Sequence, residues 1–146
     1  MTQPLDIMNH QASCVWVDGR GMLIEGAPGT GKSSLALALI DRGAVLVGDD
    51  GVALERGEGV LHASPVPATR GLLEVRNIGL VSMGPVMVAV RVAIVILLDP
   101  EAPRFVEQPE SVTRHGISLP LIRLWPGSPV LHLRAELALR RYGLAV

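Results

Sequence analysis

The stretch Gly26-Ala-Pro-Gly-Thr-Gly31-Lys32-Ser33 decides how this sequence is interpreted, because it matches the pattern G-x-x-x-x-G-K-[S/T]. It follows a short apolar run and precedes residues 32–42, whose leucines and alanines favour a helix. Glycines in such a loop let backbone amides turn toward a phosphate, and the start of the helix adds its unpaired amides. The motif therefore predicts a site for ATP and Mg²⁺, in which Lys32 contacts the β- and γ-phosphates and Ser33 binds the metal. The residues expected to bind the nucleotide are Gly26, Ala27, Pro28, Gly29, Thr30, Gly31, Lys32, Ser33 and Ser34.

The segments around this loop predict a βαβ unit. Residues 12–17 and 22–24 are apolar and are separated by Asp-Gly-Arg-Gly, a spacing typical of a β-hairpin. The helix ends before Gly43, and residues 44–47 form a second buried strand. Strand, loop, helix and strand in this order predict that the strands before and after the helix run parallel.

Beyond residue 51 the chain consists of short apolar segments separated by glycine and proline, which predict strands of one sheet system. These segments are residues 52–54, 60–62, 72–75, 80–81, 86–90 and 92–98. The remaining predictions are a mobile loop over 100–118, a last pair of strands at 117–124 and 130–133, and a terminal helix at 134–142. We expect one α/β domain over residues 1–146.

Composition excludes several classes of partner. The net charge is −1, Lys32 is the sole lysine and aromatic residues make up 3%, which argues against nucleic acid as a partner. Residues 85–98 are the most apolar segment, but Arg91 interrupts them and they are too short to span a membrane. Residues 1–6 lack an export signal, and the single Cys14 forms no internal disulfide, so we expect a cytoplasmic protein.

Two places offer the carboxylate that a P-loop enzyme needs near its metal. Asp49-Asp50 follows the strand at 44–47, and should emerge at the same sheet edge as the phosphate loop. Asp99 follows the strand at 92–98 and is the competing candidate. Paired acids suit phosphoryl transfer, because one can bind near the metal while the other accepts a proton. Asp50-Gly51 and Asp99-Pro100 are also turn dipeptides, so a purely structural role is the alternative for both.

Three stretches together resemble the HPr kinase/phosphorylase family: the phosphate loop, Leu46-Val-Gly-Asp-Asp50, and Leu73-Glu-Val-Arg-Asn-Ile-Gly-Leu80. The resemblance implies a P-loop domain related to the phosphoenolpyruvate carboxykinase-like fold, with a mixed sheet and flanking helices. It implies transfer of phosphate from ATP to a serine of the phosphocarrier protein HPr, and a homo-oligomer, in this family a hexamer. The short forms found in alphaproteobacteria lack the large N-terminal domain of longer members, and this chain resembles them.

The same resemblance assigns roles to residues of the three stretches. Asp49 is similar to the general base that accepts the serine proton, with Asp50 beside it and Lys32 as a further catalytic residue. Ser33, Asp50 and Glu74 are implied to form the Mg²⁺ site. Without the resemblance, Glu74 and Arg76 would be interpreted as a surface ion pair on one face of a strand.

This chain departs from the family pattern at three places. Asn77 stands where the signature commonly has glycine, and Gln11 stands where the family has a histidine near the phosphates, with His10 one residue earlier. Ser128 stands where longer members carry an arginine tied to phosphorolysis, although Arg123 is an alternative source of that charge. We therefore expect kinase activity with weak phosphorolysis of phospho-HPr.

Two other functions are consistent with the phosphate loop. One is a small P-loop kinase acting on a metabolite, for which residues 100–118 would supply a lid with Arg104 and Arg114. The other is a regulatory module that senses ATP without transferring phosphate.

Overall fold

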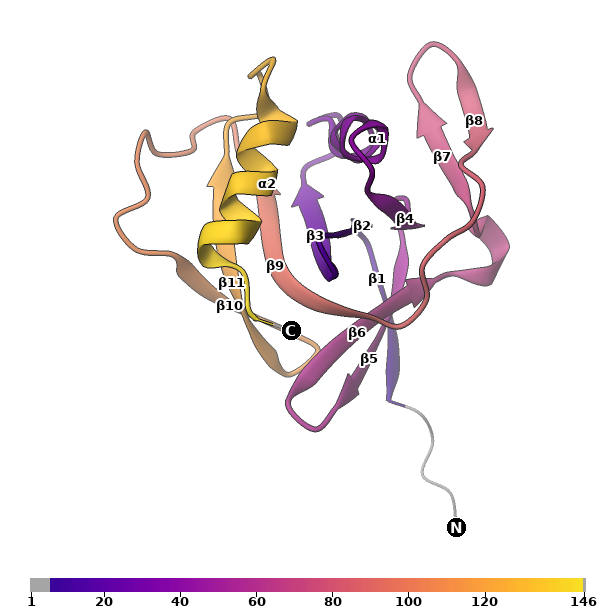
Figure 1. Cartoon of the computed structure of the whole chain (residues 1–146), viewed down its shortest axis with the longest axis horizontal. Coiled ribbons are helices and arrows are strands. Elements are labelled where there is room, and N and C mark those ends of the chain that lie inside the picture. Colours follow the sequence, from indigo (N-terminus) through magenta and orange to yellow (C-terminus); the bar gives the residue numbers. More distant parts are fainter. Residues whose placement is uncertain (1–5, 146) are drawn as a thin grey trace.

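The computed structural model describes residues 6–145, in which one large curled sheet carries two α-helices (Figure 1). The sheet has nine strands in the order β1-β5-β6-β9-β3-β2-β4, with β11 and then β10 added beside β9. The elements are β1 (Ile7–His10), β2 (Ser13–Val17), β3 (Arg20–Gly26), α1 (Lys32–Asp41), β4 (Val45–Gly48), β5 (Val52–Gly57), β6 (Val60–Pro65), β7 (Leu72–Val75), β8 (Gly79–Ser82), β9 (Val90–Leu98), β10 (Glu110–Arg114), β11 (Ile117–Leu124) and α2 (Leu131–Tyr142). The expected lack of an export signal concerns residues that, except for Asp6, lie outside the described part.

The predicted hairpin before the phosphate loop is confirmed. Strands β2 and β3 pair antiparallel, with Val17 opposite Arg20. The two residues between them, Asp18 and Gly19, have φ of 51° and 80°. Positive φ at both central positions is the geometry that matches the twist of a two-residue hairpin, and aspartate and glycine are the residues that tolerate it.

Strand directions bring the ends of several strands to one edge of the sheet. Strands β3, β9 and β11 are parallel, with Leu98 opposite both Gly26 and Leu124. Strands β3 and β4 both pair antiparallel with β2, so they run parallel to each other, as predicted. They are not neighbours, however, because β2 lies between them. The phosphate loop, Asp49 and Asp99 consequently share this edge.

The core consists of aliphatic side chains on both sides of the curled sheet. Helices α1 and α2 cover one side, where Leu35 and Leu139 pack with Ile24, Ile94 and their neighbours (Figure 1). On the other side a second cluster, which includes Leu23, joins strands of the two halves of the sheet. The expected mixed sheet with flanking helices is therefore confirmed. No helix within residues 6–145 is long and apolar enough to cross a membrane.

Several predictions for the second half of the chain were wrong. Residues 130–133 are not a strand, since α2 already begins at Leu131. The buried positions Leu131, Ala135, Ala138 and Leu139 have helical spacing, which a run of four residues is too short to reveal. Strand β10 lies inside the predicted loop at 100–118 and forms the last antiparallel pair with β11. Its side chains are polar and largely exposed, so the apolar pattern did not mark it.

Three further differences concern the strands. Strands β7 and β8 form a separate two-stranded sheet rather than joining the main one. The apolar residues 86–89 are not a strand, and β9 begins at Val90. The short strand β1 was not predicted, because three of its four residues are exposed.

The free Cys14 is fully buried in β2, and burial raises the pKa of its thiol to about 12.

Candidate active site

The phosphate loop connects the end of β3 to the start of α1, as the motif predicts. Gly26, Gly29 and Gly31 have φ of 154°, 81° and 101°, conformations that residues with a side chain rarely adopt. A Cβ on Gly26 would also lie 2.7 Å from Oγ1 of Thr30. The Nζ of Lys32 donates a hydrogen bond to the carbonyl of Gly26 at 2.8 Å, which folds the lysine back over its own loop.

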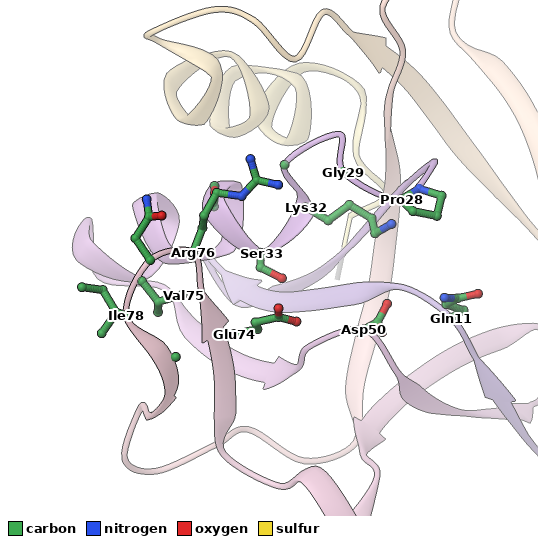
Figure 2. A pocket seen from close by; sticks show the side chains of 14 residues that line it. Gln11, Pro28, Gly29, Lys32, Ser33, Asp50, Glu74, Val75, Arg76 and Ile78 are labelled. Carbon is green, nitrogen blue, oxygen red and sulfur yellow. The ribbon is translucent and has the colours of Figure 1, made fainter.

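An open cavity of about 690 Å³ lies beside this loop (Figure 2). Figure 2 shows Lys32 and Ser33 on one side of it and Asp50 and Glu74 on the other. Of the residues expected to bind nucleotide, Gly26, Ala27 and Thr30 belong to the loop but do not line the cavity. The lining residues are Gln11, Pro28, Gly29, Gly31, Lys32, Ser33, Ser34, Asp50, Glu74, Val75, Arg76, Asn77, Ile78 and Gly79.

Asp49 is hydrogen-bonded to the first turn of α1. One of its carboxylate oxygens accepts hydrogen bonds from the hydroxyls of Ser33, at 2.7 Å, and Ser13, at 2.8 Å. The other oxygen accepts the backbone amide of Glu74 at 2.9 Å. Asp49 therefore joins the phosphate loop, β2 and β7, three segments that are far apart in the sequence.

Asp50 points into the cavity instead. Its φ of 57° is in the left-handed region, which is uncommon for a residue other than glycine and recurs at functional sites. The turn around it is tight, because a Cβ on Gly48 would lie 2.5 Å from the carbonyl oxygen of Gly51. Asp49 and Asp50 thus lie at a turn, and this turn presents two carboxylates to different surroundings.

Strands β7 and β8 contain residues 73–80, the third of the stretches that resemble the family, and place part of it at the cavity. Glu74 and Arg76 both line it, and no ion pair joins them among residues 6–145. Asn77 has φ of 71°, in the turn of this hairpin. Asparagine is enriched among non-glycine residues in that conformation, which explains how it replaces the glycine of the family signature.

Gln11 and His10, the two residues near the place of the family's histidine, lie differently with respect to the cavity. Gln11 lines it, and His10 does not. The Nε2 of His10 lies 2.8 Å from an oxygen of Glu25, the residue just before the phosphate loop. Glu25, which no sequence motif marked, also binds Arg114, the residue considered above for a lid. Ser13 was likewise missed, because a buried serine in an apolar strand has no motif of its own.

The residues at the neighbouring strand ends are held in other interactions. Asp99 pairs with Arg123 at 2.9 Å, and Arg123 also pairs with Glu110 at 2.7 Å. Ser128 is buried, and its hydroxyl accepts the backbone amide of Val130 at 3.1 Å before α2. Arg123 is therefore not a free substitute for the arginine of longer family members.

The oxygen atoms around Ser33 suit a magnesium ion. Hydroxyl and carboxylate oxygens are the ligands it prefers, and P-loop sites use one or two of them together with phosphate oxygens and water. Ser33, Asp50 and Glu74 line one cavity and supply this donor set. Within residues 6–145, no three histidine, cysteine or acidic side chains form a ligand cluster, so the phosphates would have to complete the coordination.

Comparison with known proteins agrees with this geometry. Residues 6–97 match the model of the HPr Serine kinase C-terminal domain. The HPr kinase/phosphorylase of Chloroherpeton thalassium is 36% identical over 90% of this chain, and that of Clostridium novyi is 48% identical over 46% of it. The chain spans 43% and 22% of the length of these two relatives.

A solved structure extends the likeness to three dimensions. The structure of the Hpr(Ser) kinase/phosphatase from Coxiella burnetii superposes with a TM-score of 0.81 and 29% identity. The match covers 91% of this chain and 94% of that one. The chain therefore belongs to the HPr serine kinase C-terminal domain family.

Proposed function

We propose that this protein is an ATP-dependent serine kinase of the phosphocarrier protein HPr, with weak phosphorolysis of phospho-HPr. The supporting observation is that one cavity is lined by the phosphate loop, Asp50 and the Glu74–Gly79 stretch, the three segments that resemble the family. The kinase/phosphorylase names of the relatives point to the same reaction.

The phosphate loop would bind the nucleotide. Gly29, Gly31 and the first residues of α1 line the cavity, where their backbone amides would contact phosphate. Lys32 would leave the carbonyl of Gly26 to contact the β- and γ-phosphates. Ser33, Asp50 and Glu74 would hold Mg²⁺, which offsets charge on the transferring phosphoryl group when bound. The Ser33 hydroxyl would keep donating its hydrogen to Asp49 while a lone pair of its oxygen binds the metal, so Asp49 would orient it.

The attacking serine must lose its proton as its oxygen bonds to the γ-phosphorus and the bond to ADP breaks. We assign this proton to Asp49 by resemblance to the family. Both oxygens of Asp49 already accept hydrogen bonds, so the serine hydroxyl would replace that of Ser13. Asp50 lines the cavity directly and is the second candidate.

The proposed acceptor is a folded protein, which would rest on the rim of the open cavity. Residues 100–118 and α2 are the segments that we expect to contact it. The loop after β9 lies at the same sheet edge as the phosphate loop, and Phe105 on it is 73% exposed. We further propose a cytoplasmic homo-oligomer, in this family a hexamer, which light scattering of the purified protein would test.

Incubation with Mg²⁺, ATP and purified HPr, followed by intact-mass measurement, tests the proposal. One added phosphate is expected, and it should be absent when the acceptor serine is replaced by alanine. Lys32→Ala should abolish both the transfer and nucleotide binding, because no other lysine can offset the phosphate charge. Unmodified HPr together with a phosphorylated product from a metabolite panel would favour the metabolite kinase. ATP binding with no product of either kind would favour the sensing module.

A further inference from the structure

Glu25 is a nearly buried carboxylate that the proposed reaction does not use. Its side chain is 12% exposed and does not line the cavity. Arg114 binds it with two hydrogen bonds, Nε to Oε2 at 2.9 Å and Nη2 to Oε1 at 2.6 Å. The Nε2 of His10 lies 2.8 Å from Oε2. Burial by itself would raise the pKa of Glu25, but the hydrogen bonds from Arg114 and His10 outweigh it and lower the pKa to about 2.

The three side chains come from strands that do not pair with one another. Glu25 is on β3, His10 on β1 and Arg114 on β10. Strands β5, β6 and β9 separate β1 from β3, and β9 and β11 separate β3 from β10. The carboxylate of Glu25 therefore directly connects three strands that are not neighbours in the sheet.

Each of two members of this cluster is followed by a residue of the candidate site. Glu25 precedes Gly26, whose carbonyl accepts the hydrogen bond of Lys32 at 2.8 Å. His10 precedes Gln11, which lines the cavity. A movement of the Glu25 side chain would thus change the position of Gly26 and Gln11 relative to each other.

We propose that Glu25, held by His10 and Arg114, is a positioning residue that sets the phosphate loop and Gln11 for nucleotide binding. A bidentate arginine–carboxylate pair is strong and directional, which suits it to this role. Removing one partner of such a buried pair leaves the other uncompensated, so the loop would relax away from its binding geometry. The proposal rests on the nucleotide site proposed above.

The proposal is tested by measuring the affinity for a fluorescent ADP analogue in the presence of Mg²⁺. The proteins compared are wild type, Glu25→Gln and the control Glu136→Gln. The control is matched, because Glu136 is 11% exposed and accepts a hydrogen bond from Arg42 at 2.8 Å, at the far end of α1. We expect Glu25→Gln to weaken nucleotide binding about tenfold or more and Glu136→Gln to leave it within about twofold. Both variants should lower the Tm. Unchanged affinity in Glu25→Gln, with a Tm lowered as in the control, would show that the cluster is merely structural.

A charge exchange covers the case in which Glu25→Gln does not fold. Arg114→Glu alone should weaken nucleotide binding, and the double variant Glu25→Arg with Arg114→Glu should recover most of the loss. A double variant that binds no better than Arg114→Glu would contradict the proposal. Wild type that binds no Mg²⁺-nucleotide would refute the nucleotide site itself, whereas equal binding by wild type and Glu25→Gln refutes the positioning role alone.

Discussion

Asp49 and Asp99 occupy equivalent places at one edge of the sheet and have opposite surroundings. Asp49 follows β4 and accepts hydrogen bonds from two hydroxyls and one amide, all neutral donors. Asp99 follows β9, where the backbone amide of Glu101 and the guanidinium of Arg123 lower its pKa. The negative charge of Asp99 is compensated within the protein, while that of Asp49 remains available to a bound cation or proton.

A position at the end of a strand places an acid near a site but does not make it functional. Arg123 bridges Asp99 and Glu110, and so ties together β9, β10 and β11. No arginine or lysine pairs with Asp49 among residues 6–145, and its hydroxyl partners can rotate away. Phosphoryl transfer needs an acid without a basic partner, as at Asp49, because a carboxylate paired with arginine is a poor proton acceptor.

The largest expected effect tests this difference directly. Asp49→Asn should lower the rate of phosphoryl transfer roughly 10²- to 10⁴-fold, the usual contribution of a general base, and should keep nucleotide binding. Asp99→Asn should change the rate by no more than about threefold, since it removes an ion pair rather than a proton acceptor. Rates with HPr and nucleotide affinities measured on both variants decide between them. The reverse ranking would place the reaction at the end of β9.

The next largest effect is expected at Gly48, in the turn after β4 that carries Asp49 and Asp50. Gly48→Ala would bring a Cβ to 2.7 Å from Cγ1 of Val52 as well as against the backbone of Gly51. We expect a loss of about 1–3 kcal/mol in the free energy of unfolding, from strain of the kind seen in overpacked cores. Gly57→Ala is the control, because a Cβ there meets nothing within 4 Å. Urea unfolding of both variants provides the measurement, and equal stabilities would argue against a strained turn.

A smaller effect concerns Asn77, a left-handed residue in the β7–β8 turn that lines the cavity near Asp50. Asn77→Gly should preserve stability, whereas Asn77→Ala should cost about 1 kcal/mol, because alanine resists a φ of 71°. Differential scanning calorimetry of the two variants would detect the difference. A destabilised Asn77→Gly would mean that the asparagine side chain, and not its backbone, is what the hairpin requires.

The smallest effect is expected at Arg123. The folded-state pKa values of Asp99 and Glu110 are both lowered by their hydrogen bonds, so their contribution to stability is present above the unfolded-state values and is lost as the pH falls. Arg123→Met should therefore lower the urea midpoint slightly at pH 7, and the difference from wild type should shrink as the pH falls and the two carboxylates become protonated. A deficit that persists at low pH would show that packing of the arginine, not its charge, is responsible.

Parts of the fold with a strong local pattern could be predicted from the sequence. The β2–β3 hairpin, the parallel directions of β3 and β4, and the helix after the phosphate loop follow from turn residues and apolar spacing. The start of α2 could not, because a short apolar run has no distinct period. Strand β10 escaped detection for a different reason: its polar residues gain their structure from pairing with β11 rather than from burial.

The family, the phosphate loop and the set of candidate acids follow from the sequence alone, since these depend on residue types at fixed spacing. The folded chain was needed to show which acid meets Ser33, that Gln11 rather than His10 lines the cavity, and that Glu25 binds Arg114. Two of these contacts join residues separated by 16 and 89 positions, and the third distinguishes two adjacent residues at the end of β1. The order of strands in the sheet sets such distances, and that order follows from how the whole chain buries its apolar residues.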